Sequence, residues 1–250
     1  MNQYQTETPK LIIDSGNSAI KYFVFEKEKI IYNKISNRDS IDLVFSSLKM
    51  QYPQLKLGIY SDVTGILNNK FLSHKWEEVV FIPCDKNLQL PFSSSYETLE
   101  TIGSDRLALL AQGCTLNNNS AKLIIDMGSC ITYDVLDEEN HHLGGAISPG
   151  YLMRYKTLAK RTGQLPQLDY KRPKQMWGKS TSQSIHAGIN FGIHAEIIYR
   201  INECKSKFEE LKVIGCGGDI QRLDSTIKNK IFVKPNFLAK GLNHLLELNC

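Results

Sequence analysis

The stretch Leu11-Ile12-Ile13-Asp14-Ser15-Gly16 is repeated almost letter for letter as Leu123-Ile124-Ile125-Asp126-Met127-Gly128. Each copy is an apolar run that ends in Asp-x-Gly, and each is followed by a small polar residue, Asn17 in the first and Ser129 in the second. An internal repeat fixes the architecture before any single motif does. Two copies near the starts of the two halves of the chain therefore predict a duplicated domain.

The composition is that of an ordinary folded protein. The 250 residues suffice for one large core or two modest ones, and the spacing of the repeat favours two. A hydrophobic content of 42% and a charged content of 22% are typical of soluble globular domains. The formal net charge of +4 is too small to indicate a nucleic-acid partner by itself, and it suits small anionic substrates.

The cysteines, the first residues of the sequence and the lengths of its apolar runs together predict the cellular compartment. The six cysteines are scattered without metal-ligand spacing, so we interpret them as free thiols in a reducing environment. The first residues have neither the basic head nor the apolar segment of a signal peptide. No apolar run approaches the roughly 20 residues of a membrane-spanning helix. We expect a cytoplasmic protein with no membrane partner.

Apolar periodicity predicts the same order of elements in both halves. In the first half we expect three antiparallel strands and then alternating helices and strands, over residues 11–14, 20–25, 30–35, 39–50 (helix), 56–61, 79–83 and 103–113 (helix). In the second half we expect strands at 122–126, 131–137 and 141–148, a helix from Pro149 or Gly150, and then elements at 181–205 (helix), 212–214, 219–228 (helix), 231–233 and 237–248 (helix).

This order predicts an α/β fold of two duplicated, ribonuclease-H-like lobes, each a mixed sheet flanked by helices. The polar stretch at 117–120 favours a boundary there, which gives an N-terminal lobe of residues 1–118 and a C-terminal lobe of residues 119–250. Ligands of open α/β sheets bind at the carboxyl ends of strands. We therefore expect Asp14 and Asp126 on opposite walls of a cleft between the lobes.

The two turns have the chemistry of a phosphate site. Gly16 and Gly128 allow close approach of a ligand to backbone N–H groups. Asn17, Ser18 and Ser129 add small neutral donors that suit phosphate oxygens. An isolated Asp-x-Gly is usually only a turn, but the duplication with the same preceding residues favours a functional site.

The carboxylates of Asp14 and Asp126 would repel phosphate unless a cation lies between them. The pattern therefore predicts a nucleotide together with metal. A third glycine cluster, Gly215-Cys216-Gly217-Gly218, follows a predicted strand and either holds an anion or lies against a nucleoside. A tight strand-to-helix connection explains it equally well.

In this order the motifs resemble the type III pantothenate kinases, a family of the actin/Hsp70/sugar-kinase superfamily. Asp14-Ser15-Gly16-Asn17-Ser18-Ala19-Ile20-Lys21 is similar to the first phosphate motif of the family, Gly103-Ser104-Asp105-Arg106 to its substrate motif, and the stretch 126–134 to its second phosphate motif. Blocks at 144–150, 162–166, 181–188 and Gly217-Gly218 complete the set. Ser18 and Ser129 stand where threonine is commoner, and Cys130 stands where alanine is.

The resemblance implies transfer of the γ-phosphoryl group of ATP to the primary hydroxyl of pantothenate, the first step towards coenzyme A. It implies that Asp105 accepts the hydroxyl proton, although its position at a helix start beside Arg106 should lower its pKa. Arg106 would hold the pantothenate carboxylate, and Tyr96 would contact the substrate. Thr181 would reach the pocket from a partner subunit of a homodimer; the alternative is a helix N-cap.

The resemblance also implies two cations. Asp14 would bind Mg²⁺ through water, because Mg²⁺ usually keeps several of its waters. Asp126 would bind a monovalent cation, K⁺ or NH₄⁺. Lys21 ends the first motif and either touches phosphate or faces solvent.

Two alternatives remain beside this interpretation. One is another small-molecule kinase of the superfamily, such as a sugar kinase, and the other is a non-catalytic ATP-binding regulator. The segment 154–179 carries eight basic residues against one acidic residue, Asp169. We interpret it as a solvated face that attracts small anions rather than as a nucleic-acid site, because no pattern of stacking aromatic residues accompanies it.

Overall fold

The computed structural model describes residues 8–116 and 119–250. Contacts divide the chain into two units, Met1–Leu116 together with Asn236–Cys250, and Asn117–Pro235. The predicted lobe boundary after residue 118 falls beside residues 117–118, which lie outside the described residues.

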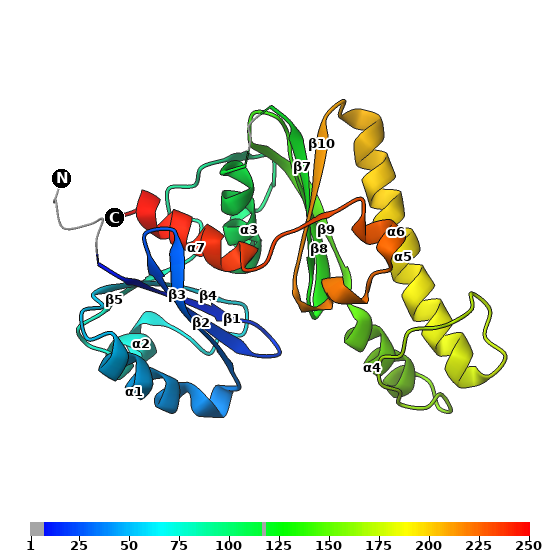
Figure 1. Cartoon of the computed structure of the whole chain (residues 1–250), viewed down its shortest axis with the longest axis horizontal. Helices are drawn as coiled ribbons and strands as arrows, with labels where there is room; N and C mark the ends of the chain where they lie inside the picture. Colours follow the sequence, from blue (N-terminus) through cyan, green and yellow to red (C-terminus); the bar gives the residue numbers. More distant parts are fainter. Residues whose placement is uncertain (1–7, 117–118) are drawn as a thin grey trace. The chain divides into compact units, whose positions relative to one another are not determined.

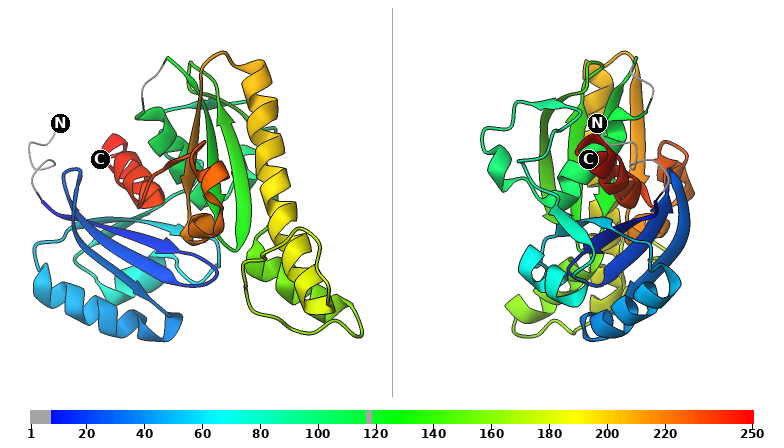
Figure 2. Two further views of the ribbon diagram at one scale, coloured as in Figure 1. Left: turned by 45° about the vertical axis from the view of Figure 1, so that its right-hand side comes forward. Right: turned by 90° about the vertical axis from the view of Figure 1, so that its left-hand side faces the viewer.

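The first unit is built on a five-stranded mixed sheet (Figures 1 and 2). The strand order is β3-β2-β1-β4-β5, with β1–β3 antiparallel and β4 and β5 parallel to β1. The strands are β1 Lys10–Ser15, β2 Ile20–Glu26, β3 Lys29–Ser36, β4 Leu57–Asp62 and β5 Val80–Pro83, and a two-residue strand β6 follows at Ser93–Ser94. The helices are α1 Ile41–Gln51, α2 Asn69–Lys75, α3 Ser104–Cys114 and α7 Phe237–Leu248, with short 3-10 turns η1 Arg38–Ser40 and η2 Leu99–Thr101.

Helices cover both faces of this sheet, because the large apolar side chains of β1 and β2 point alternately to one face and to the other. Leu11 and Ile13 pack with Val44 and Leu48 of α1. Ile12 faces the other way and packs with helices α3 and α7. Figure 1 shows α1 and α2 on one side of the strands and α3 and α7 on the other.

The second unit repeats this sheet. Its strand order is β9-β8-β7-β10-β11, with β7–β9 antiparallel and β10 and β11 parallel to β7. The strands are β7 Ala121–Met127, β8 Cys130–Leu136, β9 His141–Pro149, β10 Leu211–Cys216 and β11 Phe232–Val233. The helices are α4 Tyr151–Arg161, α5 Thr181–Lys207 and α6 Ser225–Lys228, with a 3-10 turn η3 Gly218–Arg222.

The long helix α5 supplies most of the core of this unit. It buries Ile189, Ile193, Ile197 and Ile201 at helical spacing, and these side chains pack on the odd-numbered residues of β7. Figure 2 shows α5 running along the sheet as a single straight helix.

Equivalent strands have equivalent partners, so the duplication is confirmed. Asp14 lies opposite Lys21 and beside Ser61 in the first sheet. Asp126 lies opposite Thr132 and beside Cys216 in the second. The predicted fold class, two mixed sheets flanked by helices, is therefore correct, and the cleft between the lobes stays a prediction.

The last helix differs from the expectation. Residues 236–250 were assigned to the C-terminal lobe, but α7 packs on α3, β1 and β4 in the first unit. The physical reason is close helix packing: a side chain at Gly241 would collide with the backbone of Ala108 in α3. Asn243 adds a hydrogen bond to the carbonyl of Lys27 at 3.1 Å.

One local prediction also needs correction. The helix expected at 219–228 is broken into η3 and α6, because the carboxylate of Asp224 accepts the N–H of Ile227 at 3.1 Å and begins a new helix. Helix α4 agrees with its predicted start near Pro149 or Gly150: it begins at Tyr151 with Gly150 as its N-cap, and Pro149 ends β9. Helix α2, capped by Asn68, was not predicted. Among the described residues, every helix is too short or too polar to cross a membrane.

Candidate functional site

The first Asp-x-Gly turn connects β1 to β2. Asp14 is buried, and its carboxylate accepts a hydrogen bond from the ammonium of Lys21 at 2.9 Å. The N–H of Gly16 donates to the carbonyl of Ala19 at 3.1 Å, which closes the turn. Asn17 and Ser18 are exposed at its tip. The structure therefore places an ion pair, with a buried carboxylate and a partly exposed ammonium, beneath a tip of small polar residues.

The end of β4 lies beside this turn. Asp62 accepts hydrogen bonds from the N–H and the hydroxyl of Thr64, at 2.9 and 2.6 Å, and from the N–H of Leu67 at 2.6 Å. Burial raises the pKa of Asp62, but these bonds and one from Ser15 outweigh burial, and the pKa is lower than usual. The carboxylate therefore stays ionised and holds the loop after β4.

Helix α3 begins at the same edge of the sheet. The hydroxyl of Ser104 lies 2.8 Å from that of Ser61 and accepts the N–H of Asp62 at 3.1 Å. The carboxylate of Asp105 accepts a hydrogen bond from the N–H of the next residue, Arg106, at 2.8 Å. A side chain at position 103 would meet this carboxylate in its present position, so glycine there leaves room for Asp105.

Arg106 and Tyr96 lie together, as their predicted common role requires. The guanidinium of Arg106 is buried and lies 5.3 Å from the centre of the Tyr96 ring, within the range of a cation–π contact. A planar guanidinium held on a ring is oriented for a two-point contact with a carboxylate. Tyr96 and the Gly103–Arg106 motif thus form one cluster in the first unit.

The second Asp-x-Gly turn is packed against two other glycine motifs. Gly217 has a φ of +87°, and a side chain there would collide with the carbonyl of Met127 and the carboxylate of Asp126. The N–H of Gly150 donates to the carbonyl of Ser129 at 3.0 Å. Carboxylate and carbonyl oxygens therefore gather where the sequence motifs around 126, 150 and 217 meet.

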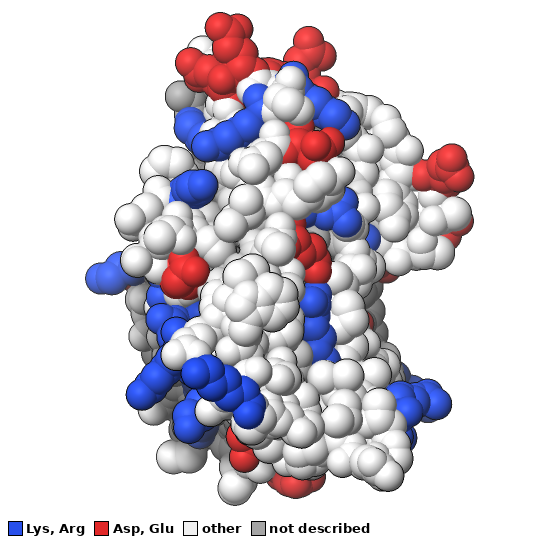
Figure 3. Space-filling view, turned by 90° about the vertical axis from the view of Figure 1, so that its right-hand side faces the viewer, with Lys and Arg blue, Asp and Glu red and all other residues white. Residues whose placement is uncertain are grey.

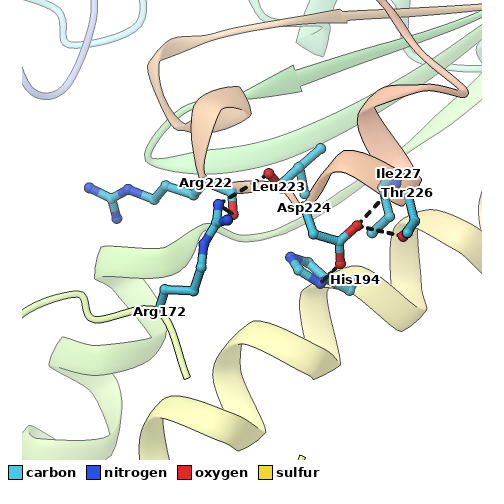
Figure 4. A network of polar contacts seen from close by, with 7 residues as sticks. All are labelled: Arg172, His194, Arg222, Leu223, Asp224, Thr226 and Ile227. Carbon is cyan, nitrogen blue, oxygen red and sulfur yellow. Dashed lines mark hydrogen bonds and ion pairs between the residues drawn. The ribbon is translucent and has the colours of Figure 1, made fainter. Parts of the chain in front are cut away.

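A polar network holds the end of η3 and the start of α6, which follow the glycine turn at 217 (Figure 4). Arg172 donates to the carbonyls of Arg222 and Leu223 at 2.9 and 3.2 Å, and His194 of α5 lies 3.1 Å from the Asp224 carboxylate. Burial lowers the pKa of His194 more than Asp224 raises it. Arg222 also lies over the ring of Tyr170 at 4.3 Å. The irregular segment before α5 is thus fastened to η3.

Thr181 belongs to the second unit, whereas the Tyr96 cluster belongs to the first. It is the first residue of α5 and is exposed, and the N-cap is Ser180, so the alternative role as N-cap is wrong. Thr181 lines an open pocket of about 750 Å³ between α4 and α5, together with Arg154, Leu158, Leu165 and Ile185.

The ligand atoms around Asp14 and Asp126 can be compared with the coordination that the expected cations need. Within residues 8–116 and 119–250, no group of three His, Cys, Asp or Glu side chains could hold a metal ion. A Mg²⁺ that keeps its waters and binds nucleotide oxygens needs only one or two carboxylates, so Asp14 fits it. The oxygens around Asp126 and Met127 suit a cation bound by carboxylate and carbonyl groups.

The basic segment 154–179 is spread over helix α4 and the irregular chain before α5. Arg154 is engaged by Glu196 at 2.6 Å, and Arg172 by backbone carbonyls. Figure 3 shows the Lys and Arg side chains of this face in separate groups rather than in one continuous stripe. The arrangement favours the interpretation as a solvated face.

Asp62 and Thr64 were missed by the sequence analysis. The available signal was an Asp-x-Thr sequence directly after the predicted strand 56–61, a pattern typical of an Asx turn. Its link to Ser104 depends on the parallel pairing of β1 with β4, which brings distant residues to one edge.

The duplicated sheets, the paired Asp-x-Gly turns and the Gly-x-Asp-Arg helix start define a phosphotransferase of the nucleotide-binding α/β class. The sequence pattern of the type III pantothenate kinases matches residues 10–203. The chain belongs to this family, whose members phosphorylate pantothenate with ATP and a divalent metal in coenzyme A biosynthesis.

Individual relatives agree with this assignment. A type III pantothenate kinase of Christiangramia forsetii is 39% identical over 96% of this chain and 98% of its own. One from Flavobacterium johnsoniae is 36% identical over 95% and 97%. A crystal structure from Campylobacter jejuni, of a protein assigned to the Baf family of transcriptional activators, covers 95% of this chain and 97% of its own with a TM-score of 0.64 and 21% identity, which shows the shared fold.

Proposed function

We propose that this chain transfers the γ-phosphoryl group of ATP to the primary hydroxyl of pantothenate, with Asp105 as the acceptor of the hydroxyl proton. The observation that carries the proposal is the cluster at the start of α3. Asp105 and the stacked pair of Arg106 and Tyr96 lie in the unit that holds the Asp14 turn. The hydrogen bond between Ser61 and Ser104 joins the two parts.

Each residue of the cluster has a distinct task in this proposal. Arg106 binds the pantothenate carboxylate, and Tyr96 packs on the guanidinium and contacts the substrate. Gly103 and Ser104 shape the helix start that presents Asp105. Phosphoryl transfer passes through a loose transition state, in which proton removal comes late, so a weak but well-placed base suffices.

The residues from Ser15 to Lys21 and Ser129 bind ATP in this proposal. Small side chains at Asn17, Ser18 and Ser129 face phosphate oxygens, and Gly16, Ala19 and Ile20 form the turn that presents them. Bound Mg²⁺ would supply charge neutralisation of the phosphates, and Asp14 would hold it through water. Lys21, which pairs with Asp14, is positioned to share in this neutralisation.

Asp126 binds a monovalent cation, K⁺ or NH₄⁺, in the same proposal. The position of the carbonyl oxygen of Met127 supports this assignment, since this oxygen lies with the Asp126 carboxylate against Gly217. We further infer a homodimer, in which the exposed Thr181 contributes to the partner's pantothenate pocket, and a cytoplasmic location.

The test is an ADP-release assay with ATP, Mg²⁺ and pantothenate in K⁺ and in Na⁺ buffers. We expect turnover that depends on pantothenate and is higher with K⁺ or NH₄⁺. Turnover with hexoses in place of pantothenate would favour the sugar-kinase alternative. No turnover together with a strongly salt-dependent affinity for DNA would favour the non-catalytic regulator.

A further inference from the structure

A continuous hydrogen-bonded bridge joins the first phosphate turn to the start of α3. The hydroxyl of Ser15, directly after Asp14, lies 3.2 Å from that of Thr64. Thr64 reaches the Asp62 carboxylate at 2.6 Å, and the Asp62 N–H reaches the Ser104 hydroxyl at 3.1 Å. Ser104 directly precedes Asp105.

The ionised carboxylate of Asp62 fixes the direction of its bond to Thr64. Asp62 only accepts, so Thr64 donates its one hydroxyl hydrogen to it. The hydroxyl of Ser15 lies at hydrogen-bond distance from that of Thr64 and also interacts with the Asp62 carboxylate, so Ser15 joins the phosphate turn to both groups. Ser15 and Ser61 are fully buried, whereas Asp62, Thr64 and Ser104 are half-buried, so the bridge runs from the interior of the sheet to its edge.

The bridge lies between the two parts of the site that must be aligned. The Asp14 turn is the proposed phosphate grip, and Asp105 is the proposed proton acceptor. The backbone supports the same frame, since the N–H of Val63 donates to the carbonyl of Ser15 at 3.2 Å. Phosphoryl transfer depends on alignment more than on any covalent step of the protein.

We infer that Thr64 and Asp62 are positioning residues, which set the placement of the α3 helix start relative to the phosphate turn. Neither needs to touch substrate. The inference rests on the proposed function of Asp105 and the Asp14 turn, and it adds two residues that the sequence motifs do not contain.

The experiment compares Thr64→Val with Thr64→Ser. Valine has the shape of threonine without the hydroxyl, so it cuts the links to Ser15 and Asp62 and leaves the backbone bond to Asp62. Serine keeps the hydroxyl. We expect Thr64→Val to lower kcat about tenfold, with KM for ATP and pantothenate within about twofold, since the loss of these two part-buried hydrogen bonds has roughly that effect. Thr64→Ser should retain wild-type kcat.

A matched control is Asp137→Asn. Asp137 also caps a turn by accepting N–H groups, of Glu139 and His141 at 2.9 and 2.8 Å, but it lies in the β8–β9 hairpin of the second unit. We expect its kcat to equal that of the wild type. Circular dichroism of all variants checks that each is folded.

A second measurement separates this inference from the proposed function. Hydrogen exchange of the amides around residues 15–16 and 104–106 should quicken together in Thr64→Val and in neither control. If the wild type fails to phosphorylate pantothenate, the proposed function is wrong, and exchange still tests the bridge. Equal kcat for Thr64→Val and Thr64→Ser, or unchanged exchange, would overturn the inference.

Discussion

The two Asp-x-Gly turns occupy equivalent places in equivalent sheets, but their neighbours differ. Across the hairpin, Asp14 meets the ammonium of Lys21, whereas Asp126 meets the neutral Thr132. Next to the first turn, the parallel strand β4 ends in a loop that Asp62 holds by hydrogen bonds. Next to the second turn, the parallel strand β10 ends in a glycine turn whose backbone lies against Asp126 itself.

This difference shows how a duplicated fold acquires two tasks. A lysine beside the first carboxylate supplies positive charge from the protein, so the site can bind phosphate with one hydrated cation. Backbone oxygens beside the second carboxylate supply negative partial charge, so that site favours a cation. The same Asp-x-Gly sequence therefore serves two purposes because the parallel neighbour strand ends differently.

The strongest test of the division of tasks is Asp105→Asn. Asp105 is the acid at the start of the helix beside the first turn, so we expect a loss of turnover of about 10³-fold, within the range for general-base catalysis. Asparagine can still accept the N–H of Arg106, so the helix should remain.

Urea unfolding of Asp105→Asn should match that of the wild type, and the KM for ATP should change little. Turnover near that of the wild type in this variant would show that Asp105 is not the proton acceptor.

The second test compares the two turn carboxylates directly. We expect Asp14→Asn to raise the Mg²⁺ concentration needed for half-maximal turnover, and Asp126→Asn to remove the difference between K⁺ and Na⁺. Each effect should be about 10- to 100-fold, as for groups that hold a metal through a second layer of contacts.

Titrations of turnover with each cation measure both effects. Asp42→Asn is the control, because Asp42 is an exposed residue of α1 that pairs with Lys75 of α2. If both variants changed the response to the same cation, the two turns would share one task.

Much of this comparison could be predicted from the sequence. The repeated LIID run indicated the duplication, and the strand-prone stretches around 22–25 and 131–137 indicated hairpins, because alternation and turn residues are local signals. The packing of α7 on the first unit could not be predicted, since it depends on the fit of Gly241 to Ala108. The bridge through Asp62 and Thr64 was hidden for a similar reason: it requires knowing that β4 lies next to β1.

The third test compares the backbone of two turns: the first Asp-x-Gly turn, and the glycine turn at 217 that lies against the second. Gly217→Ala places a side chain at a positive φ and against the Asp126 turn, so we expect the free energy of unfolding to fall by about 1–3 kcal/mol. Gly16→Ala in the first turn meets only an ordinary contact, with the carbonyl of Ala19 at 3.5 Å, and should cost far less.

Urea unfolding measures both variants, and Gly218→Ala is the adjacent control, because a side chain there meets open space. Equal losses for Gly217→Ala and Gly16→Ala would show that the two turns are equally tolerant.

The smallest expected effect is a difference in the response to acid. Burial and the Arg172 charge lower the pKa of His194 below its ordinary value of 6.5, against the opposing effect of Asp224. The folded state therefore binds this proton less readily than the unfolded state. The stability from neutral His194 is present above pH 6.5 and falls as the pH is lowered below that value.

The loop of the first unit should respond only in stronger acid. The pKa of Asp62 is lowered from 3.8, so its contribution is lost only as the pH falls below that ordinary value. Between pH 7 and pH 5, hydrogen exchange should therefore quicken in η3 and α6 of the second unit before it changes at residues 62–67. His194→Gln should remove the early change, and His74→Gln, at an exposed position on α2, should not. If residues 62–67 opened first, the glycine turn of the second unit would not be the more acid-sensitive of the two.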